Sequence, residues 1–266
     1  MKLARVIYIL LALVIVGLLC YQGFVTKELN SSGLIRAILL LIAAVIGFLR
    51  TFRRNVSNKK STYRNAYGKH IGDAFDDDPK LEKQLYQAID DFNKDAYSAG
   101  IRKLEKLDRQ CTRSAQRFTV QFFMALCYEG QNNYRSAIES YRKALTMRQD
   151  SSAASNLGMC YTKIGDFSNA VEYYQLASRL DSKNPFPLNN LAQLYLRNGD
   201  YEEVIPYAMQ AIQLDGNFRQ ANEALTVTYA MLDDPQQYEH YYRRSITCGS
   251  DGNKLIAFIR SLQDSN

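Results

Sequence analysis

The sequence is poor in the residues that most often carry out chemistry. It has two histidines, His70 and His240, which lie far apart along the chain, and it has no tryptophan. The short motifs of zinc proteases, phosphate-binding loops, serine hydrolases and dinucleotide-binding domains are all missing. These absences argue against an enzyme, and we predict no catalytic residue, no cofactor and no bound metal.

The cysteines and the acidic run give no pattern typical of a bridged or metal-binding site. The five cysteines are odd in number and spread along the chain without a CxxC pair. A disulfide framework or a zinc site is therefore not expected, and a reducing compartment fits better. The aspartates between 73 and 78 lack the alternating oxygen ligands and closing glutamate of a calcium loop, so we predict an acidic linker and helix start.

Acidic residues are almost missing from the first part of the chain. Residues 1–72 carry eleven Lys/Arg and one acid, Glu28, for a net charge of +10. Residues 73–266 carry 22 bases and 26 acids, for a net charge of −4. A nucleic-acid-binding domain would place its basic excess on the folded part. We therefore expect no nucleic acid partner and look to anionic lipid instead.

Two apolar runs predict a membrane anchor. Residues 6–26 form an uncharged stretch of 21 residues, and as a helix this stretch is about 30 Å long, the thickness of a bilayer's hydrocarbon core. The alternative is a cleaved signal peptide, for which the run is too long. Residues 34–49 form a second run, interrupted by Arg36, and an interfacial helix that does not span stays open for it. We predict a transmembrane helical hairpin.

The basic residues after the second run set the orientation. Basic residues beside a membrane segment stay in the cytosol, so we predict that both termini and the rest of the chain are cytosolic. The compact architecture favours a bacterial inner membrane. Five of these side chains are predicted to meet lipid headgroups, although a plain stop-transfer flank would look the same: Arg53, Arg54, Lys59, Lys60 and Arg64.

The rest of the chain contains an internal repeat. Small, aromatic and turn residues recur every 33 or 34 residues. The central copy has Gly158, Tyr161, Gly165-Asp166, Ala170 and Tyr174. The copy before it has Ala125, Tyr128, Asn132-Asn133, Ala137 and Tyr141, and the copy after it has Ala192, Tyr195, Gly199-Asp200, Val204 and Ala208. Each copy predicts two short helices joined by a turn, with small residues where the helices approach and aromatic residues between successive units.

These copies resemble the tetratricopeptide repeat, most closely over residues 154–184. The departures are Val204 for an alanine, Pro206 inside a helix and no glycine at Asn132. The resemblance implies an all-α solenoid in which each helix pair stacks on the next. We predict a two-helix anchor (1–52), a basic then acidic linker (53–78), a solenoid of about five units (79–248), and a capping helix and tail (249–266).

Cys127 and Cys160 occupy equivalent places one unit apart, each just before the tyrosine of its copy. Leu194 and Thr228 stand at the same place in later units. A position that accepts such residues is typical of a small core site, so we interpret the two thiols as core rather than as nucleophiles or ligands.

The resemblance also implies a binding face. In related proteins the first helix of each unit lines a concave face that holds extended peptides, and Asn156 and Asn190 stand where asparagines grip the peptide. Further contacts are predicted at Ser155, Met159, Lys163, Asn189, Gln193 and Arg197. The lysines and arginine with which some relatives hold a C-terminal carboxylate are replaced by Ser152, Ser155, Phe186 and Asn189. That the two asparagines are only consensus surface residues stays open.

Together these features predict a membrane-anchored cytosolic scaffold that binds a protein or peptide partner through its concave face. The alternative is a structural or assembly subunit of a membrane protein complex that acts mainly through its transmembrane hairpin, where small residues such as Gly17 and Gly47 allow close helix packing. The sequence names no partner and leaves self-association open.

Overall fold

The computed structural model describes residues 67–68, 70–72 and 74–264. Both apolar runs and the basic residues 53–64 lie outside this part, so the predicted hairpin and its lipid contacts stay predictions. Within the described part, no helix combines the length and the apolar character needed to cross a membrane. The helices below all belong to the second of the chain's two units, residues 69–266.

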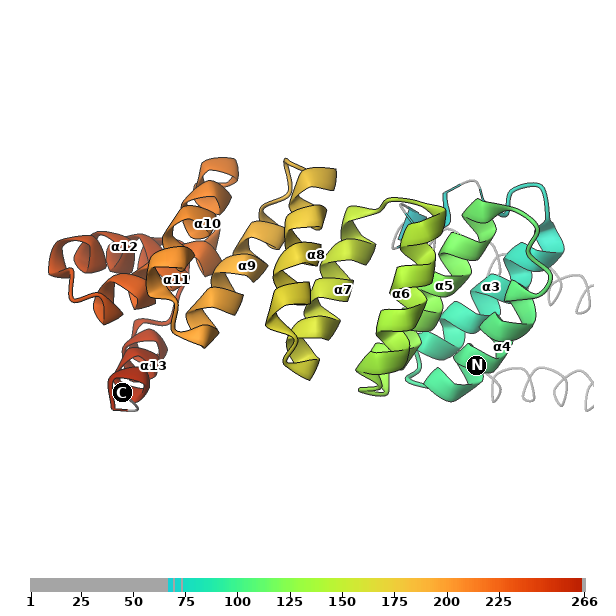
Figure 1. Cartoon of the computed structure of the whole chain (residues 1–266), viewed down its shortest axis with the longest axis horizontal. Helices are drawn as coiled ribbons and strands as arrows, with labels where there is room; N and C mark the ends of the chain where they lie inside the picture. Colours follow the sequence, from blue (N-terminus) through green and yellow to red (C-terminus); the bar gives the residue numbers. More distant parts are fainter. Residues whose placement is uncertain (1–66, 69, 73, 265–266) are drawn as a thin grey trace, which may run out of the picture. The chain divides into compact units, whose positions relative to one another are not determined.

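Five helix pairs follow one another along the described part, and one further helix closes it (Figure 1). The first two pairs are α3 (Pro79–Phe92) with α4 (Tyr97–Asp108), and α5 (Ser114–Gly130) with α6 (Tyr134–Met147). The next two are α7 (Ser151–Ile164) with α8 (Phe167–Leu180), and α9 (Pro185–Asn198) with α10 (Tyr201–Leu214). The last pair is α11 (Arg219–Met231) with α12 (Pro235–Thr247), and the closing helix is α13 (Gly252–Gln263).

Local side chains explain where many of these helices begin. The Asp78 carboxylate accepts hydrogen bonds from the backbone N–H groups of Lys80 and Leu81, at 3.1 and 3.0 Å, and so caps α3. Such a cap stabilises a helix by about 1 kcal/mol because it satisfies donors that have no partner inside the helix. The same role falls to Asn133, Asp150, Asp166, Asn184, Asp234 and Asp251.

The predicted turns are confirmed. Gly165 and Gly199 end α7 and α9 with φ of 79° and 82°, a conformation that costs glycine nothing because it has no Cβ. The aspartate after each glycine stands at the N-cap of the next helix. In the earlier unit Asn132 adopts φ 57°, which asparagine tolerates better than most residues, so the missing glycine is replaced without loss of the turn.

The close approach predicted at small residues is confirmed at Gly158. A Cβ built there would lie 2.8 Å from Cδ1 of Tyr174, so the ring occupies the space that a side chain on α7 would need. Tyr174 is 4% exposed, and the equivalent Tyr141 is completely buried. Cys127 and Cys160 are also completely buried, which confirms their interpretation as core residues.

Three other tyrosines stack within their own helix pair. Tyr161, which was expected between successive units, stacks on Tyr173 of the partner helix, with ring centroids 5.5 Å apart. The arrangement recurs at the same spacing in the next two pairs, as Tyr195 on Tyr207 and Tyr229 on Tyr241. Tyr195 also contacts Phe167 of the preceding pair edge to face, with centroids 5.4 Å apart, which agrees with its expected place between units. Tyr141 and Tyr174 are buried more deeply than any ring of these stacks.

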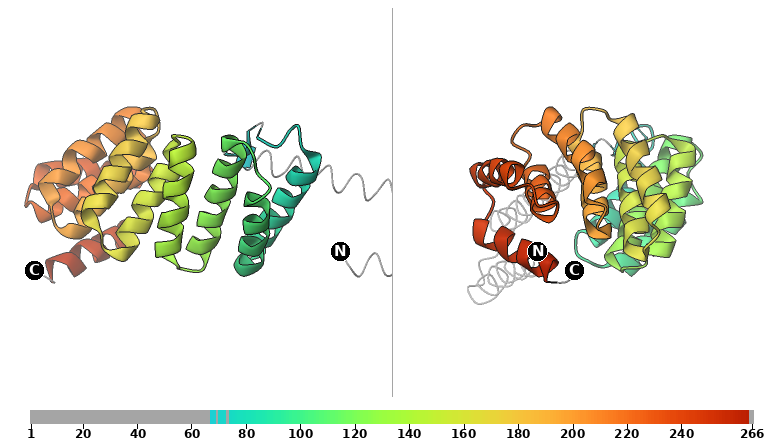
Figure 2. Two further views of the ribbon diagram at one scale, coloured as in Figure 1. Left: turned by 45° about the vertical axis from the view of Figure 1, so that its right-hand side comes forward. Right: turned by 60° about the vertical axis from the view of Figure 1, so that its left-hand side comes forward.

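The first helices of the pairs lie on the inner side of the stack. Within the described residues α7 contacts α9, α9 contacts α11, and α3 contacts α5, whereas the second helices of successive pairs do not approach one another as closely. Figure 2 shows the pairs following one another when the molecule is turned. Because the side on which units come together is the inside of a curve, the concave face is formed by the first helices.

Four residues before α3 pack against the solenoid, and we call them the wedge: His70, Ile71, Ala74 and Phe75. His70 stacks on Phe122 of α5, with ring centroids 4.1 Å apart, and its carbonyl accepts a hydrogen bond from Thr119 at 2.8 Å. Ile71 and Phe75 are 1% and 0% exposed. This stretch was expected to belong to a linker, but its residues contact the solenoid. His70 lies between α5 and Asp150, the N-cap of α7, and the carbonyl of Ala74 accepts a hydrogen bond from Arg113 at the start of α5.

We predict that Gly158→Val lowers the free energy of unfolding by about 1–3 kcal/mol, because the new side chain must displace the Tyr174 ring. Urea denaturation followed by far-UV circular dichroism measures this loss. Gly216→Ala is the control, since nothing lies within 4 Å of its missing Cβ. Equal stability of both variants would show that the packing of the Tyr174 ring does not require a glycine at position 158.

Candidate functional site

A hollow of about 220 Å³ opens between α7 and α9 on the inner side of the stack. We call it the α7–α9 hollow. Its lining comes from both first helices, with one tyrosine from α8: Met159, Thr162, Lys163, Tyr174, Asn190, Gln193, Leu194 and Arg197. Two adjacent repeats thus contribute to one open site.

Two parallel stripes of side chains explain this convergence. In each first helix, residues separated by four, three and four positions share one face. The stripe on α7 is Ser152, Asn156, Met159 and Lys163, and the stripe on α9 is Phe186, Asn190, Gln193 and Arg197. The regular period of the repeat therefore places residues 34 positions apart in equivalent places.

The structure brings five of the eight predicted peptide contacts to this hollow. They are Met159, Lys163, Asn190, Gln193 and Arg197. Ser155 and Asn156 lie beside it, on the same helix, and are half-buried. Asn189 is only 7% exposed, which does not fit a residue that touches a ligand. Whether any of these side chains contacts a peptide stays a prediction.

The two asparagines are engaged within the protein. Asn156 donates from Nδ2 to the Tyr141 hydroxyl at 3.0 Å, and Asn190 donates from Nδ2 to Oγ of Ser155 at 3.3 Å. The first bond joins α7 to α6, and the second joins α9 to α7. Each asparagine therefore links a repeat to the one before it. From the sequence we expected either contact with a peptide or a simple surface position, and we did not expect this role.

The hollow is positively charged at one end. Lys163 and Arg197 are exposed, and no acidic side chain lines the hollow with them. Arg197 also acts on the tyrosine behind it: burial raises the pKa of Tyr174, and the positive charge of Arg197 opposes part of that shift. The ends of the two stripes thus offer cations and neutral hydrogen-bonding groups to whatever enters.

Sequence reasoning missed a buried polar cluster beneath the stripe on α7. The Tyr141 hydroxyl donates to the Glu129 carboxylate, and the same hydroxyl accepts from Asn156. Burial raises the pKa of Glu129 to about 7, although the hydrogen bonds from Tyr141 and Cys160 oppose the shift. A glutamate in the last turn of a helix gives no sign in the sequence that the repeat stack will bury it.

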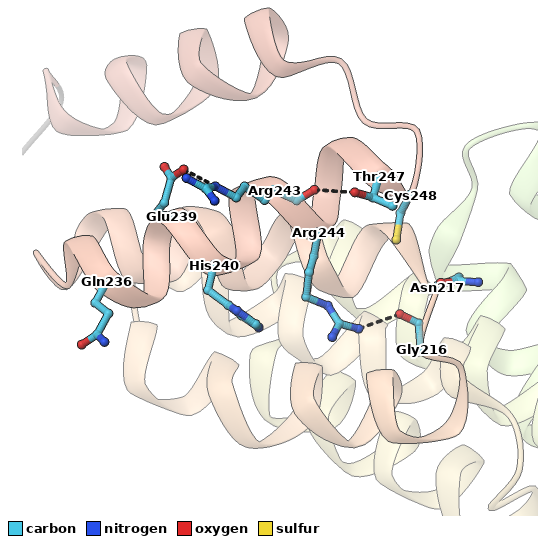
Figure 3. A pocket seen from close by; sticks show the side chains of 9 residues that line it. All are labelled: Gly216, Asn217, Gln236, Glu239, His240, Arg243, Arg244, Thr247 and Cys248. Atoms are coloured by element: carbon cyan, nitrogen blue, oxygen red, sulfur yellow. Dashed lines mark hydrogen bonds and ion pairs between the residues drawn. The ribbon is translucent and has the colours of Figure 1, made fainter.

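A larger hollow of about 620 Å³ lies on the other side of the last pair (Figure 3). It runs along α12 and reaches the loop between α10 and α11. Arg244 donates to the Gly216 carbonyl at 2.9 Å and to Oδ1 of Asn222 at 3.0 Å, while Arg243 pairs with Glu239. Because both arginines are held by groups of the protein, this hollow is explained by the packing of α12 on the preceding loop.

Comparison with known proteins agrees with the helix pairs. Two models of the tetratricopeptide repeat match the chain, over residues 124–185 and residues 173–205. No curated protein sequence matches it.

Solved structures share the fold. MamA is 17% identical over 60% of this chain and 93% of its own, with a TM-score of 0.56. A MamA fragment from Desulfovibrio magneticus RS-1 is 14% identical over 64% and 95%, with a TM-score of 0.56. YrrB, described as a TPR protein with an unusual peptide-binding site, is 16% identical over 71% and 97%, with a TM-score of 0.56. Residues 124–205 therefore match the tetratricopeptide repeat, and the described helix pairs share the fold of these solved structures.

The Glu129 cluster predicts a pH-dependent stability. Because the folded pKa lies above the usual value near 4.3, the protonated carboxyl stabilises the fold below about pH 4, and this contribution is lost as the pH rises toward 7. Glu129→Gln keeps the neutral form, so its stability relative to the natural protein should rise between pH 4 and pH 7, by on the order of 3 kcal/mol.

Denaturation curves of both proteins at several pH values measure this difference. Glu172→Gln, at an exposed position on α8, is the control and should show a flat difference. If the stability difference between Glu129→Gln and the natural protein also stays constant with pH, the carboxyl of Glu129 ionises in the folded protein without an energetic cost.

Proposed function

We propose that this protein is a membrane-anchored scaffold whose solenoid binds an extended segment of a partner protein along the inner face of α7 and α9. The observation that carries the proposal is the convergence of side chains from two adjacent repeats on one open hollow of about 220 Å³. Rigid helices hold these side chains in place, so binding costs little reordering of the site.

The likeness to YrrB supports a peptide ligand, since the description of that protein names a peptide-binding site. At 16% identity the likeness extends to the fold, and the choice of ligand rests on this chain's own side chains. The hollow suits a segment in extended conformation, because its polar groups recur along each stripe and can meet successive backbone groups of a peptide.

The buried thiols support binding rather than chemistry. Burial raises the pKa of Cys111 to about 11 and that of Cys127 to about 12, so both thiols are protonated at neutral pH and are poor nucleophiles. In our proposal the protein therefore acts as a platform and transforms no substrate.

The membrane part of the proposal rests on the sequence. In this proposal residues 1–52 form the anchor and the basic stretch after them connects it to the solenoid, with Arg53, Arg54, Lys59, Lys60 and Arg64 at the lipid headgroups. The basic flank keeps the solenoid (79–248) and its cap (249–266) in the cytosol, at the inner membrane of a bacterium. Confinement to a surface raises the effective concentration of the hollow for partners in the same membrane.

We expect that a promiscuous labelling enzyme fused to the C-terminus marks a specific set of neighbours in the native cell. Met159→Ala combined with Gln193→Ala should remove these neighbours, because both side chains line the hollow. The matched control combines Lys143→Ala with Glu172→Ala, two exposed positions in a different hollow between α6 and α8. Neighbours that persist in the first variant and disappear in the second would place the binding site on the outer face.

An exchange of the anchor separates this function from that of an assembly subunit acting through its hairpin. We expect a chain with residues 1–52 replaced by an unrelated two-span anchor to keep the neighbours of the natural protein, because the solenoid selects them. Loss of these neighbours, with the solenoid still folded and facing the cytosol, would support the intramembrane role, for which small residues such as Ala43 and Ala44 are suited.

A further inference from the structure

We propose that the segment bound on the inner face carries an acidic side chain and, about five residues away, an aromatic or large apolar one. The inference rests on the proposed function and goes beyond it, because it names the chemistry of the partner. Its basis is a pair of cations at the ends of the two stripes and one exposed aromatic residue at the opposite end of the α9 stripe.

The cation pair consists of Lys163 on α7 and Arg197 on α9. Both side chains are exposed, both line the α7–α9 hollow, and neither forms an ion pair with a described residue. The other side chains that line the hollow are neutral. A carboxylate placed between them would gain two charge-assisted hydrogen bonds, the strongest kind available to an exposed peptide.

The pair belongs to two repeats of the described solenoid rather than to all of them. At the equivalent position the preceding repeat has Gly130 and the following repeat has Met231. The positive charge on this face therefore marks one place along the stack. A general feature of the repeat would be expected in every unit.

Lys163 and Arg197 also stand at helix ends, and stabilisation of these ends is another explanation for their charges. Arg179 allows this explanation to be tested. A basic residue in the last turn interacts favourably with the carbonyl end of its helix. Arg179 has this role at the end of α8, where it is exposed but lies outside the hollow. If the charges served the helices alone, Lys163, Arg197 and Arg179 would be equivalent in every measurement.

Phe186 is the aromatic end of the stripe. Its side chain is 57% exposed, the highest value among the large apolar residues of the described part. The ring contacts Phe218 edge to face, with centroids 5.2 Å apart, and Phe218 is buried. A half-open aromatic surface that is already held in place can accept an apolar side chain at little entropic cost.

The spacing of the two ends sets the spacing of the ligand. Eleven residues of α9 separate Phe186 from Arg197, which corresponds to about 16 Å along the helix. An extended peptide covers this distance in about five residues. Gln193 lies between the two ends, where its amide can meet the peptide backbone without selecting its side chains.

The carboxylate that we assign is that of an aspartate or glutamate side chain. The α7–α9 hollow is open, so an internal residue can reach both cations without the chain having to end there. A C-terminal carboxylate has the same chemistry, and amidated probes remove it from the test.

The test uses the full-length chain, purified in a mild detergent, and synthetic peptides of about 12 residues that are acetylated and amidated. The first probe carries one glutamate and one phenylalanine five residues apart in a neutral background. The second has glutamine for the glutamate, the third has serine for the phenylalanine, and the fourth has the two residues adjacent. A peptide library of mixed composition is measured alongside.

We expect the first probe to bind and each of the other three to bind at least about tenfold more weakly, as the loss of a hydrogen bond to a charged group predicts. Lys163→Glu and Arg197→Glu should weaken the first probe by a similar factor, whereas Arg179→Glu should not. The double variant that carries both reversals should prefer a probe with lysine in place of glutamate. Thermal unfolding shows whether the three variants remain equally folded.

Two other results are decisive. If library peptides bind but without preference for the acidic residue, or if Arg179→Glu weakens binding as much as the other reversals, the acidic motif is wrong and the proposed function stands. If no peptide of the library binds the folded chain, the inner face is not a peptide site, and the proposed function fails together with the motif.

Discussion

A pair of 14-residue helices cannot enclose its own apolar residues, and stacking on the next pair is the interaction on which the rest of this structure depends. The completely buried Tyr141 illustrates this, because its hydroxyl is held from two directions, by Glu129 of the helix before it and by Asn156 of the pair after it. Repeats joined in this way place equivalent side chains at equal intervals, and the inner-face stripes are a direct consequence.

The regular part of the fold could be predicted from sequence because it depends on short-range constraints. Gly165 marks a turn by its backbone freedom, and Gly158 marks a helix contact by the side chain it lacks. Periodicity also placed Asn156 and Asn190 correctly on the inner side. It could not show that these amides already form hydrogen bonds within the protein, because the partners Tyr141 and Ser155 lie on other helices. The sequence gives no sign that these residues come into contact with the asparagines.

The irregular part could not be predicted for the same reason. Ile71 and Phe75 are isolated apolar residues in a charged stretch, without the period that identifies a helix face, and only the folded solenoid buries them. Glu129 is similar, since a carboxyl becomes buried only when a neighbouring repeat covers it. Charge and burial at such positions are properties of the assembled stack rather than of any one segment.

The contacts of the wedge have a consequence for the synthesis of the chain. Thr119 lies 49 residues after His70, and Asp150 follows later still, so the wedge is made well before the surface that receives it. At about 5–20 residues per second, the ribosome takes roughly 4–16 s to pass from residue 70 to residue 150. During that interval the contacts of His70 with α5 and with Asp150 cannot form, so this part of the nascent chain is more open to chaperones and proteases than in the finished solenoid. Its protection depends on how soon α5 to α7 emerge and pair.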